Sequence, residues 1–234
     1  MPSTDPSTTL ADLVTAQPAL AADLDRLGLD FCCGGQRPLA DAVADAGLDL
    51  EKVIAMIEAT PEAPSDPGWE GMDGLVDHLE TTHHAYLSDA LPRLTALADK
   101  VAGVHGTNHP ELTRVATLTA EIRSELEPHL IEEESVLFPM IRELATAAES
   151  PSFPYDALSN SIGGMLTEHD AAGALLAELR ATTGGYAVPS DGCASYTLLY
   201  QGLAELEADT HVHIHKENNQ LFPLVLEAEP GLVG

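Results

Sequence analysis

Two stretches of the sequence pair a histidine with a glutamate four residues later. The first runs from His129 to Pro139 and the second from His213 to Pro223, and both follow the pattern H-x3-E-x3-L-F-P. Residues four apart lie one above the other on a helix, so each copy directs one imidazole and one carboxylate the same way. These are metal ligands at metal-ligand spacing. Incidental surface residues on an amphipathic helix would explain one copy, but the repetition with the same tail favours a metal site.

The helical phase of each pair indicates that it faces the core. With about 100° per residue, Glu133 lies about 40° from His129, within a stripe of apolar residues. The members of this stripe are Val115, Leu118, Ile122, Leu126, Val136 and Met140. The members of the corresponding stripe around His213 and Glu217 are Leu199, Leu203, Leu206, Leu221 and Leu224. Because a buried carboxylate is costly unless it is paired or coordinates a metal, these four residues favour a metal site.

Two further histidines, His211 and His215, are also four residues apart. Both fall about 160° from His213 on the helical wheel. We therefore interpret them as surface histidines and expect the metal site to form without them.

A site for two metal ions needs ligands from further helices, and single histidines are available there. His169 lies among apolar residues at helical spacing, although a buried histidine that bonds to a neighbour would look the same. In the first long pattern the apolar stripe centres nearer His83 than His84, and periodicity leaves the choice open; His78 lies off the stripe. The interval from His84 to position 129 is 45 residues and that from His169 to position 213 is 44, which indicates two similar helix hairpins.

The elements that must position these residues are four long helical patterns. They span about residues 72–101, 110–148, 155–181 and 191–226. Since the connections between them are short, neighbouring helices are expected to run antiparallel. The sequence therefore predicts an all-α protein built on an up-down-up-down four-helix bundle over residues 72–229.

A smaller helical unit precedes the bundle. Residues 1–60 contain short helical patterns around the motif Asp30-Phe31-Cys32-Cys33-Gly34-Gly35, and residues 61–71 are rich in proline and predict a linker. Buried packing is the plainer interpretation of Cys32 and Cys33, but an exposed thiolate pair could bind iron or be oxidised. Cys193 stands at the start of the fourth helix, where we expect a structural role.

The composition excludes some classes of function. The chain has 234 residues, with 10 Lys and Arg against 38 Asp and Glu, which gives a formal net charge of −28. This charge argues against binding to nucleic acid or to an anionic membrane surface. No apolar run reaches the length of a membrane span and the first residues do not form a signal peptide, so we expect a cytoplasmic protein.

Four imidazoles and two carboxylates suffice for two metal ions that share the carboxylates as bridges. This ligand set suits iron and does not exclude zinc or manganese.

The motifs together resemble the RIC-type iron–sulfur cluster repair proteins, which join a cysteine-bearing domain to a haemerythrin-like di-iron bundle. The resemblance covers nearly the whole chain. It is carried by the Cys-Cys-Gly-Gly motif, Asp77-His78, His83-His84, Val104-His105-Gly106, the two H-x3-E-x3-L-F-P stretches and Glu168-His169-Asp170. It implies a haemerythrin-like bundle with two carboxylate-bridged, non-haem iron ions. The ligands that it implies are His84, His129, Glu133, His169, His213 and Glu217.

The resemblance also implies the function, which is to help restore iron–sulfur clusters damaged by oxidative or nitrosative stress by supplying iron. Damaged or apo iron–sulfur proteins would be the partners, with nitric oxide or dioxygen as small ligands and a homodimer as one assembly. Whether the protein is an enzyme stays open between a nitric oxide-reactive centre and an iron donor, in which Cys32 and Cys33 would take part in redox chemistry or iron transfer. The alternatives are a haemerythrin-like carrier or sensor of these gases and a purely structural bundle. The Cys-Cys-Gly-Gly unit favours repair over the carrier, and the paired core-facing motifs argue against the structural bundle.

Overall fold

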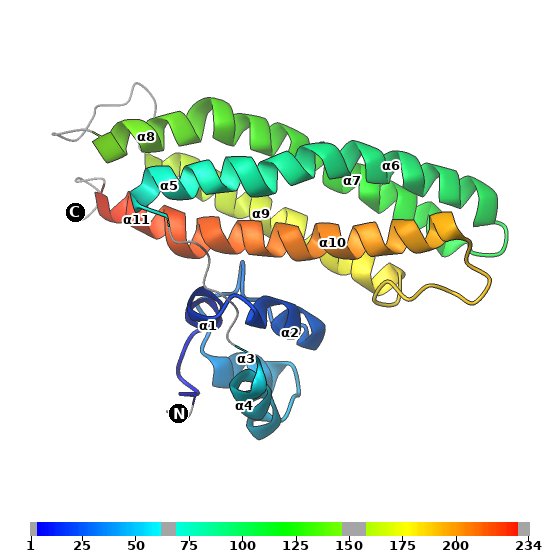
Figure 1. Ribbon diagram of the computed structural model, residues 1–234, viewed down its shortest axis with the longest axis horizontal. Coiled ribbons are helices and arrows are strands. Elements are labelled where there is room, and N and C mark those ends of the chain that lie inside the picture. The colour runs from blue at the N-terminus through cyan, green and yellow to red at the C-terminus, as the bar shows by residue number, and fades with distance from the viewer. Residues whose placement is uncertain (1–3, 62–68, 147–157, 229–234) are drawn as a thin grey trace.

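The computed structural model describes residues 4–61, 69–146 and 158–228, and every long element in these ranges is helical. Four long helical rods lie side by side along the longest axis of the molecule, and a small domain packs under one of them (Figure 1). None of the described helices is long and apolar enough to cross a membrane. The predicted all-α class and the four-helix bundle are confirmed.

Three of the four rods are interrupted by a π-helical segment. The first rod comprises α5 (Gly71–His78), η1 (Leu79–His84) and α6 (Ala85–His105); the second comprises α7 (Glu111–Glu132), η2 (Glu133–Leu137) and α8 (Phe138–Thr146). The third is α9 (Leu158–Thr182), and the fourth comprises α10 (Ala194–Lys216), η3 (Glu217–Leu221) and α11 (Phe222–Ala228). The expected start of the third helix, at residue 155, and most of the expected linker lie outside the described residues.

The bundle contains two apolar clusters. One cluster includes Leu87, Leu118, Leu176 and Leu203, and the other includes Leu75, Phe138, Met165 and Phe222. Along each rod, the predicted ligands lie where the residues of the first cluster give way to those of the second. The sequence therefore forms a polar layer across an otherwise apolar core.

The small domain consists of α1 (Leu10–Ala16), α2 (Leu20–Leu27), α3 (Leu39–Asp45) and α4 (Leu50–Ala59). The side chain of Thr9 accepts a hydrogen bond from the backbone N–H of Asp12 and so caps the first helix. The apolar core of the domain is completed by Ile214, which is 1% exposed and belongs to the bundle helix α10. A domain of this size has little core of its own, so it buries part of its apolar surface against the bundle.

Candidate metal centre

The six predicted ligands form two overlapping groups in the polar layer. One group contains His84 and His213, the other contains His129 and His169, and both contain the two glutamates at positions 133 and 217. Within each group one ligand atom of every residue lies within 4.8 Å of the others, and every member is buried. The structure thus brings together all the residues of the predicted set, from all four rods.

The distances show that each of the two carboxylates contacts histidines of both groups. In the first group, the His84 Nε2 atom lies 3.2 Å from His213 Nε2, which lies 3.0 Å from Glu217 Oε1. In the second group, His129 Nε2 lies 3.1 Å from His169 Nε2, which lies 3.2 Å from Glu217 Oε2. Thus Glu217 presents one oxygen to each pair of imidazoles.

Glu133 lies between the two imidazole pairs in a different way. Its Oε2 atom is 3.5 Å from His84 Nε2 and 3.4 Å from His129 Nε2. One carboxylate oxygen therefore faces a histidine of each group. Together with Glu217 this arrangement suits a pair of cations that share two carboxylates.

In three of the four rods, a π-helical segment begins or ends at one of the predicted ligands. The segment η1 ends at His84, η2 begins at Glu133 and η3 begins at Glu217. A π-turn holds about one more residue than an α-turn and is frequent at functional sites. The three insertions turn these side chains toward the centre without ending the helix.

The first π-segment explains why periodicity left His83 and His84 unresolved. Val76 and Leu79 precede His83 by seven and four residues, whereas Leu87 and Leu91 follow His84 by three and seven. His83 is therefore in phase with the apolar residues at the start of the rod, and His84 is in phase with those that follow η1. Both are buried, but only His84 directs a ring nitrogen at the other five residues.

His83 makes contacts outside the centre. Its Nδ1 atom is 2.9 Å from a carboxylate oxygen of Asp209 and its Nε2 atom is 3.2 Å from the ammonium nitrogen of Lys216. Its ring also stacks on the ring of His213. Its contacts are therefore those of a residue that supports a ligand.

Acidic and amide side chains orient three of the four imidazoles by bonding to the Nδ1 atom, on the side of the ring that faces away from the centre. The Nδ1 atoms of His84 and His129 lie 3.0 Å from Glu134 and 2.6 Å from Glu168, respectively. A proton held at Nδ1 by such an acceptor leaves the Nε2 lone pair free to face the centre. The Nδ1 atom of His213 has no hydrogen-bond partner among the described residues.

Asn218 performs the same task for His169, because its side-chain oxygen lies 2.7 Å from the Nδ1 atom of that ring. Sequence reasoning did not assign roles to these supporting residues. Their only signal is position, since Glu134 and Asn218 directly follow the two glutamates of the centre and Glu168 directly precedes His169.

The unpaired polar atoms of the centre are consistent with a metal site. Both carboxylate oxygens of Glu133 and the Oε2 atom of Glu217 are buried and form no hydrogen bond with any described residue. Both glutamates are 0% exposed. Leaving buried carboxylate oxygens without donors is costly, whereas coordination of a cation would satisfy them. Imidazole and carboxylate are also suitable donors for iron.

The charge balance of the centre leads to the same conclusion. Burial lowers the pKa of His129, but the carboxylates of Glu133 and Glu217 outweigh this effect and raise the pKa to about 10. Although burial raises the pKa of Glu217, the neighbouring imidazoles, His213 foremost, hold it well below its usual value. The Glu217 carboxylate thus stays ionised, and a positive charge beside it, as a proton or a cation, is favoured.

The two histidines that we expected at the surface are covered by the small domain, so that expectation is wrong. His211 Nδ1 lies 2.7 Å from a carboxylate oxygen of Asp25, and His215 Nδ1 lies 3.2 Å from the carbonyl oxygen of Phe31. His215 is only 1% exposed. They do face away from the bundle core, as their phase predicts, but the small domain packs on this side of α10.

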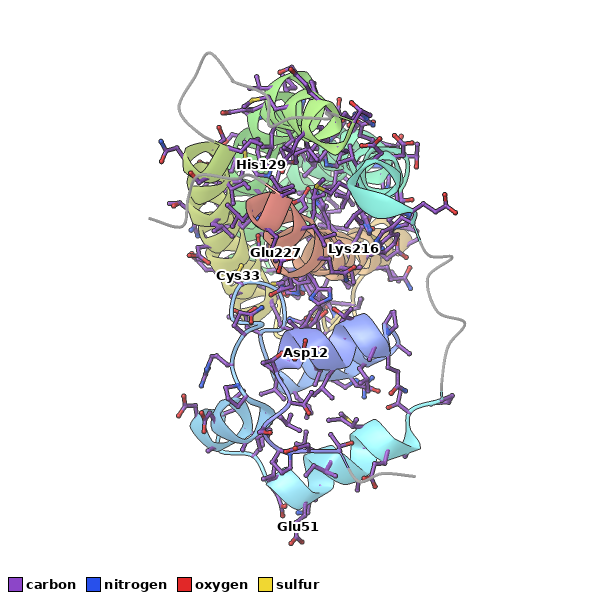
Figure 2. The ribbon with its side chains drawn as sticks, turned by 90° about the vertical axis from the view of Figure 1, so that its left-hand side faces the viewer. Asp12, Cys33, Glu51, His129, Lys216 and Glu227 are labelled. Atoms are coloured by element: carbon purple, nitrogen blue, oxygen red, sulfur yellow. The ribbon has the colours of Figure 1, made fainter. Side chains whose placement is uncertain are left out.

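The cysteine motif lies at the junction of the two units, where Figure 2 shows Cys33 between the small domain and the bundle. The carboxylate of Asp30 accepts hydrogen bonds from the backbone N–H groups of Cys32, Cys33 and Gly34 and thereby shapes the loop. The two sulfur atoms are 3.9 Å apart, and both cysteines are free.

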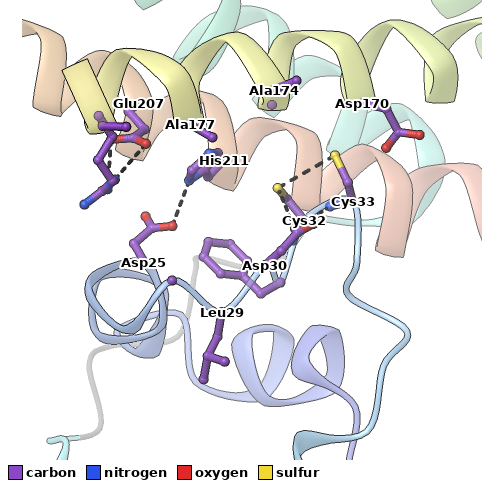
Figure 3. Close-up of a pocket in the computed structure, with 15 residues that line it drawn as sticks. Asp25, Leu29, Asp30, Cys32, Cys33, Asp170, Ala174, Ala177, Glu207 and His211 are labelled. Carbon is purple, nitrogen blue, oxygen red and sulfur yellow. Dashed lines mark hydrogen bonds and ion pairs between the residues drawn. The ribbon is translucent and has the colours of Figure 1, made fainter. Parts of the chain in front are cut away.

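The two thiols differ in their surroundings. Cys32 is buried, and its neighbour Cys33, burial and Asp30 raise the pKa of its thiol well above the usual value. The interpretation as buried packing therefore describes Cys32 better than an exposed thiolate does. Cys33 is half-buried and lines a cavity of about 400 Å³ between the small domain and the bundle, together with Ala174, Ala177 and His211 (Figure 3).

Cys193 lies away from the metal centre. It is exposed at the N-cap of α10, and its sulfur is 3.1 Å from His105 Nε2. The backbone N–H of Tyr196 and the His105 ring lower the pKa of this thiol to about 7.

Two family models of known proteins match the chain, one over the bundle and one over the small domain. Residues 75–225 match the Hemerythrin HHE cation binding domain, and residues 6–60 match a Domain of Unknown function (DUF542). Among curated proteins, the chain is similar to the Iron-sulfur cluster repair protein YtfE of Cronobacter sakazakii, Enterobacter sp. and Citrobacter koseri. Each is 32% identical over 223 residues, which cover 94% of this chain and 96–97% of the relative.

Proposed function

The chain belongs to the family of iron–sulfur cluster repair proteins with a hemerythrin HHE cation binding domain, and from this membership we propose that it is a di-iron protein that helps restore damaged iron–sulfur clusters. Its clients would be damaged or apo iron–sulfur proteins, to which it supplies iron. We further propose that it comprises a cysteine-bearing domain over residues 1–60, a linker over residues 61–71 and the di-iron bundle over residues 72–229.

The proposal is supported above all by the sharing of Glu133 and Glu217 between two groups of histidines. His84 and His213 would bind one iron ion, His129 and His169 the other, and the two carboxylates would bridge them. Bound iron would supply redox chemistry and a binding position for nitric oxide or dioxygen. The protein's part is to fix the imidazoles through Glu134, Glu168 and Asn218 and to keep the centre in a dry layer of the bundle core.

Iron is also the cargo in this proposal, and Cys33 is its proposed first acceptor. The half-buried thiol of Cys33 lies in a cavity at the domain junction, and α9 passes beside it: a Cβ atom at Gly173 would lie 3.8 Å from its sulfur. Gly173 is one helical turn beyond the predicted ligand His169. Thiolates are good ligands for iron, so the cysteine loop is well situated to receive an ion that leaves the bundle.

Iron transfer to a client tests the proposal. The iron-loaded chain is incubated without oxygen with an apo [4Fe–4S] protein, sulfide and a reductant, and the recovery of the client's cluster absorbance is followed. We expect recovery with the intact chain, slower recovery with Cys32→Ser/Cys33→Ser and unchanged recovery with the control Cys193→Ser. A loaded protein that binds nitric oxide but restores no cluster would instead be a gas carrier or sensor.

A further inference from the structure

The π-segment η3 connects the metal centre with the cysteine loop through three consecutive side chains. Glu217 faces the four histidines, and the next two residues, Asn218 and Asn219, face the small domain. Because a π-turn contains one extra residue, consecutive side chains can point to the metal centre and to the small domain. The segment is therefore a direct physical link between the two sites.

Asn218 contacts both a predicted metal ligand and the cysteine loop. Its Oδ1 atom lies 2.7 Å from His169 Nδ1, and its Nδ2 atom donates a hydrogen bond to the carbonyl oxygen of Cys32 at 3.5 Å. The oxygen and the nitrogen of one side-chain amide thus connect the His169 ring with the backbone of the cysteine loop.

Asn219 holds the same carbonyl group more closely. Its Nδ2 atom donates to the Cys32 carbonyl oxygen at 2.9 Å, and its Oδ1 atom accepts from Gln36 Nε2 at 3.0 Å. A Cβ atom at Gly35 would clash with the Phe31 carbonyl oxygen and would lie 2.9 Å from that Oδ1 atom, so glycine suits both the fold of the loop and its contact with η3. The Cys-Cys-Gly-Gly motif is therefore shaped in part by its contact with η3.

The direction of the Asn218 amide depends on which nitrogen of His169 carries the proton. An ion bound at Nε2 requires the proton at Nδ1, which then donates to Asn218 Oδ1 and leaves Nδ2 directed at the Cys32 carbonyl. When no ion is bound, the proton can occupy Nε2 and Nδ1 becomes an acceptor. An amide that turns to donate to Nδ1 places its own oxygen against the Cys32 carbonyl oxygen, and the hydrogen bond is lost.

We propose that Asn218 is a positioning residue that links the occupancy of the metal centre to the placement of the Cys32–Cys33 loop. This inference rests on the proposed function, because it requires iron at His169. An occupied centre holds the loop against η3 and α9, with Cys33 half-buried. In an empty centre the Asn218 bond is lost and Asn219 alone holds the Cys32 carbonyl, so the loop opens more often and its thiols react faster after the iron has left.

The rate of thiol alkylation measures this link. The full-length chain carrying Cys193→Ser is treated with iodoacetamide without oxygen, either metal-free or loaded with Fe(II), and modification of Cys32 and Cys33 is followed by mass spectrometry. We expect iron to slow the modification about fivefold, the scale of one hydrogen bond. Asn218→Asp still accepts from His169 but cannot donate to Cys32, so iron should no longer change its rate.

Gln220→Ala is the matched control, because Gln220 belongs to the same π-segment but contacts Thr15 and His215 instead of the cysteine loop. It should retain the full effect of iron. The bound iron is counted in every variant. If Asn218→Asp disturbs iron binding, the alkylation rates of Asn218→Ala with and without iron are compared instead.

The outcomes separate this inference from the proposed function. A parent chain that binds no iron pair contradicts both. A parent chain that binds two iron ions but shows equal alkylation rates with and without them contradicts the inference alone, as does an iron-loaded Asn218 variant that keeps the full difference. Loss of the iron effect in the Asn218 variants, with iron content and the Gln220→Ala control unchanged, supports it.

Discussion

The imidazole rings of His83 and His213 lie almost parallel, with their centroids 5.6 Å apart and an interplanar angle of 9°. His83 is thus packed against the back of a predicted ligand, and its own nitrogens bond to Asp209 and Lys216. The adjacent His84 faces the metal centre. Two neighbouring histidines therefore have different roles, which mutation can separate.

We expect His84→Ala to lower the iron content and change the iron absorption spectrum, because it removes one of four imidazoles from the centre. His83→Ala should retain both iron ions and alter the spectrum much less, since it removes only a support of His213. Metal analysis and absorption spectroscopy of the two variants check this ranking. The reverse order would assign the ligand to His83.

Glu133→Ala and Glu217→Ala should each prevent the binding of two iron ions, because each removes a carboxylate that both ligand groups share. Glu132→Ala is the matched control, since Glu132 is exposed and lies outside the centre. Iron content per chain is the measurement. Two full iron ions in both bridging variants would contradict the assignment of bridges.

The double variant His211→Ala/His215→Ala should keep its iron but weaken the attachment of the small domain. Removing His211 leaves the Asp25 carboxylate without its partner, and a partly buried polar group that loses its hydrogen bond costs about 1–3 kcal/mol. Iron analysis together with urea unfolding separates the two effects. Loss of one iron ion with the fold intact would show that these histidines belong to the centre.

Ile214→Ala should destabilise the small domain although the residue belongs to the bundle. Ile214 is buried in the domain's apolar core, and truncation of a buried isoleucine typically costs about 2–5 kcal/mol. Leu198→Ala on the same helix is the control, because Leu198 is 60% exposed and should change the unfolding free energy little. Denaturant unfolding of the two variants tests this, and equal stabilities would show that the domain does not depend on Ile214.

The reactivity of Cys193 should depend on pH around neutrality. A pKa lowered to about 7 means that the reactive thiolate predominates above pH 7 and is lost as the pH falls below it. In a Cys32→Ser/Cys33→Ser background, the alkylation rate should therefore rise with a midpoint near pH 7. His105→Ala should move the midpoint only part of the way upward, because the Tyr196 backbone N–H makes the larger contribution. A midpoint near the ordinary thiol value in the unmutated site would contradict this.

Helical periodicity was sufficient to predict the bundle and five of the six residues that meet in its centre, while the sixth, His84, came from the family resemblance. The H-x3-E spacing places an imidazole and a carboxylate on one face, and the surrounding apolar stripe turns that face inward. For the same reason His169 could be recognised as core-facing. These features are local, so the sequence alone determines them.

Tertiary structure decided the choice between neighbouring histidines and the contacts between distant segments, which periodicity could not predict. A π-turn breaks the regular phase of a helix, so the sequence pattern could not separate His83 from His84. Contacts between distant segments decided the rest: the small domain covers His211 and His215, and Asn218 joins His169 to the Cys32 loop 186 residues away in sequence. Such contacts depend on how helices and domains pack in space, and no spacing within one helix records that packing.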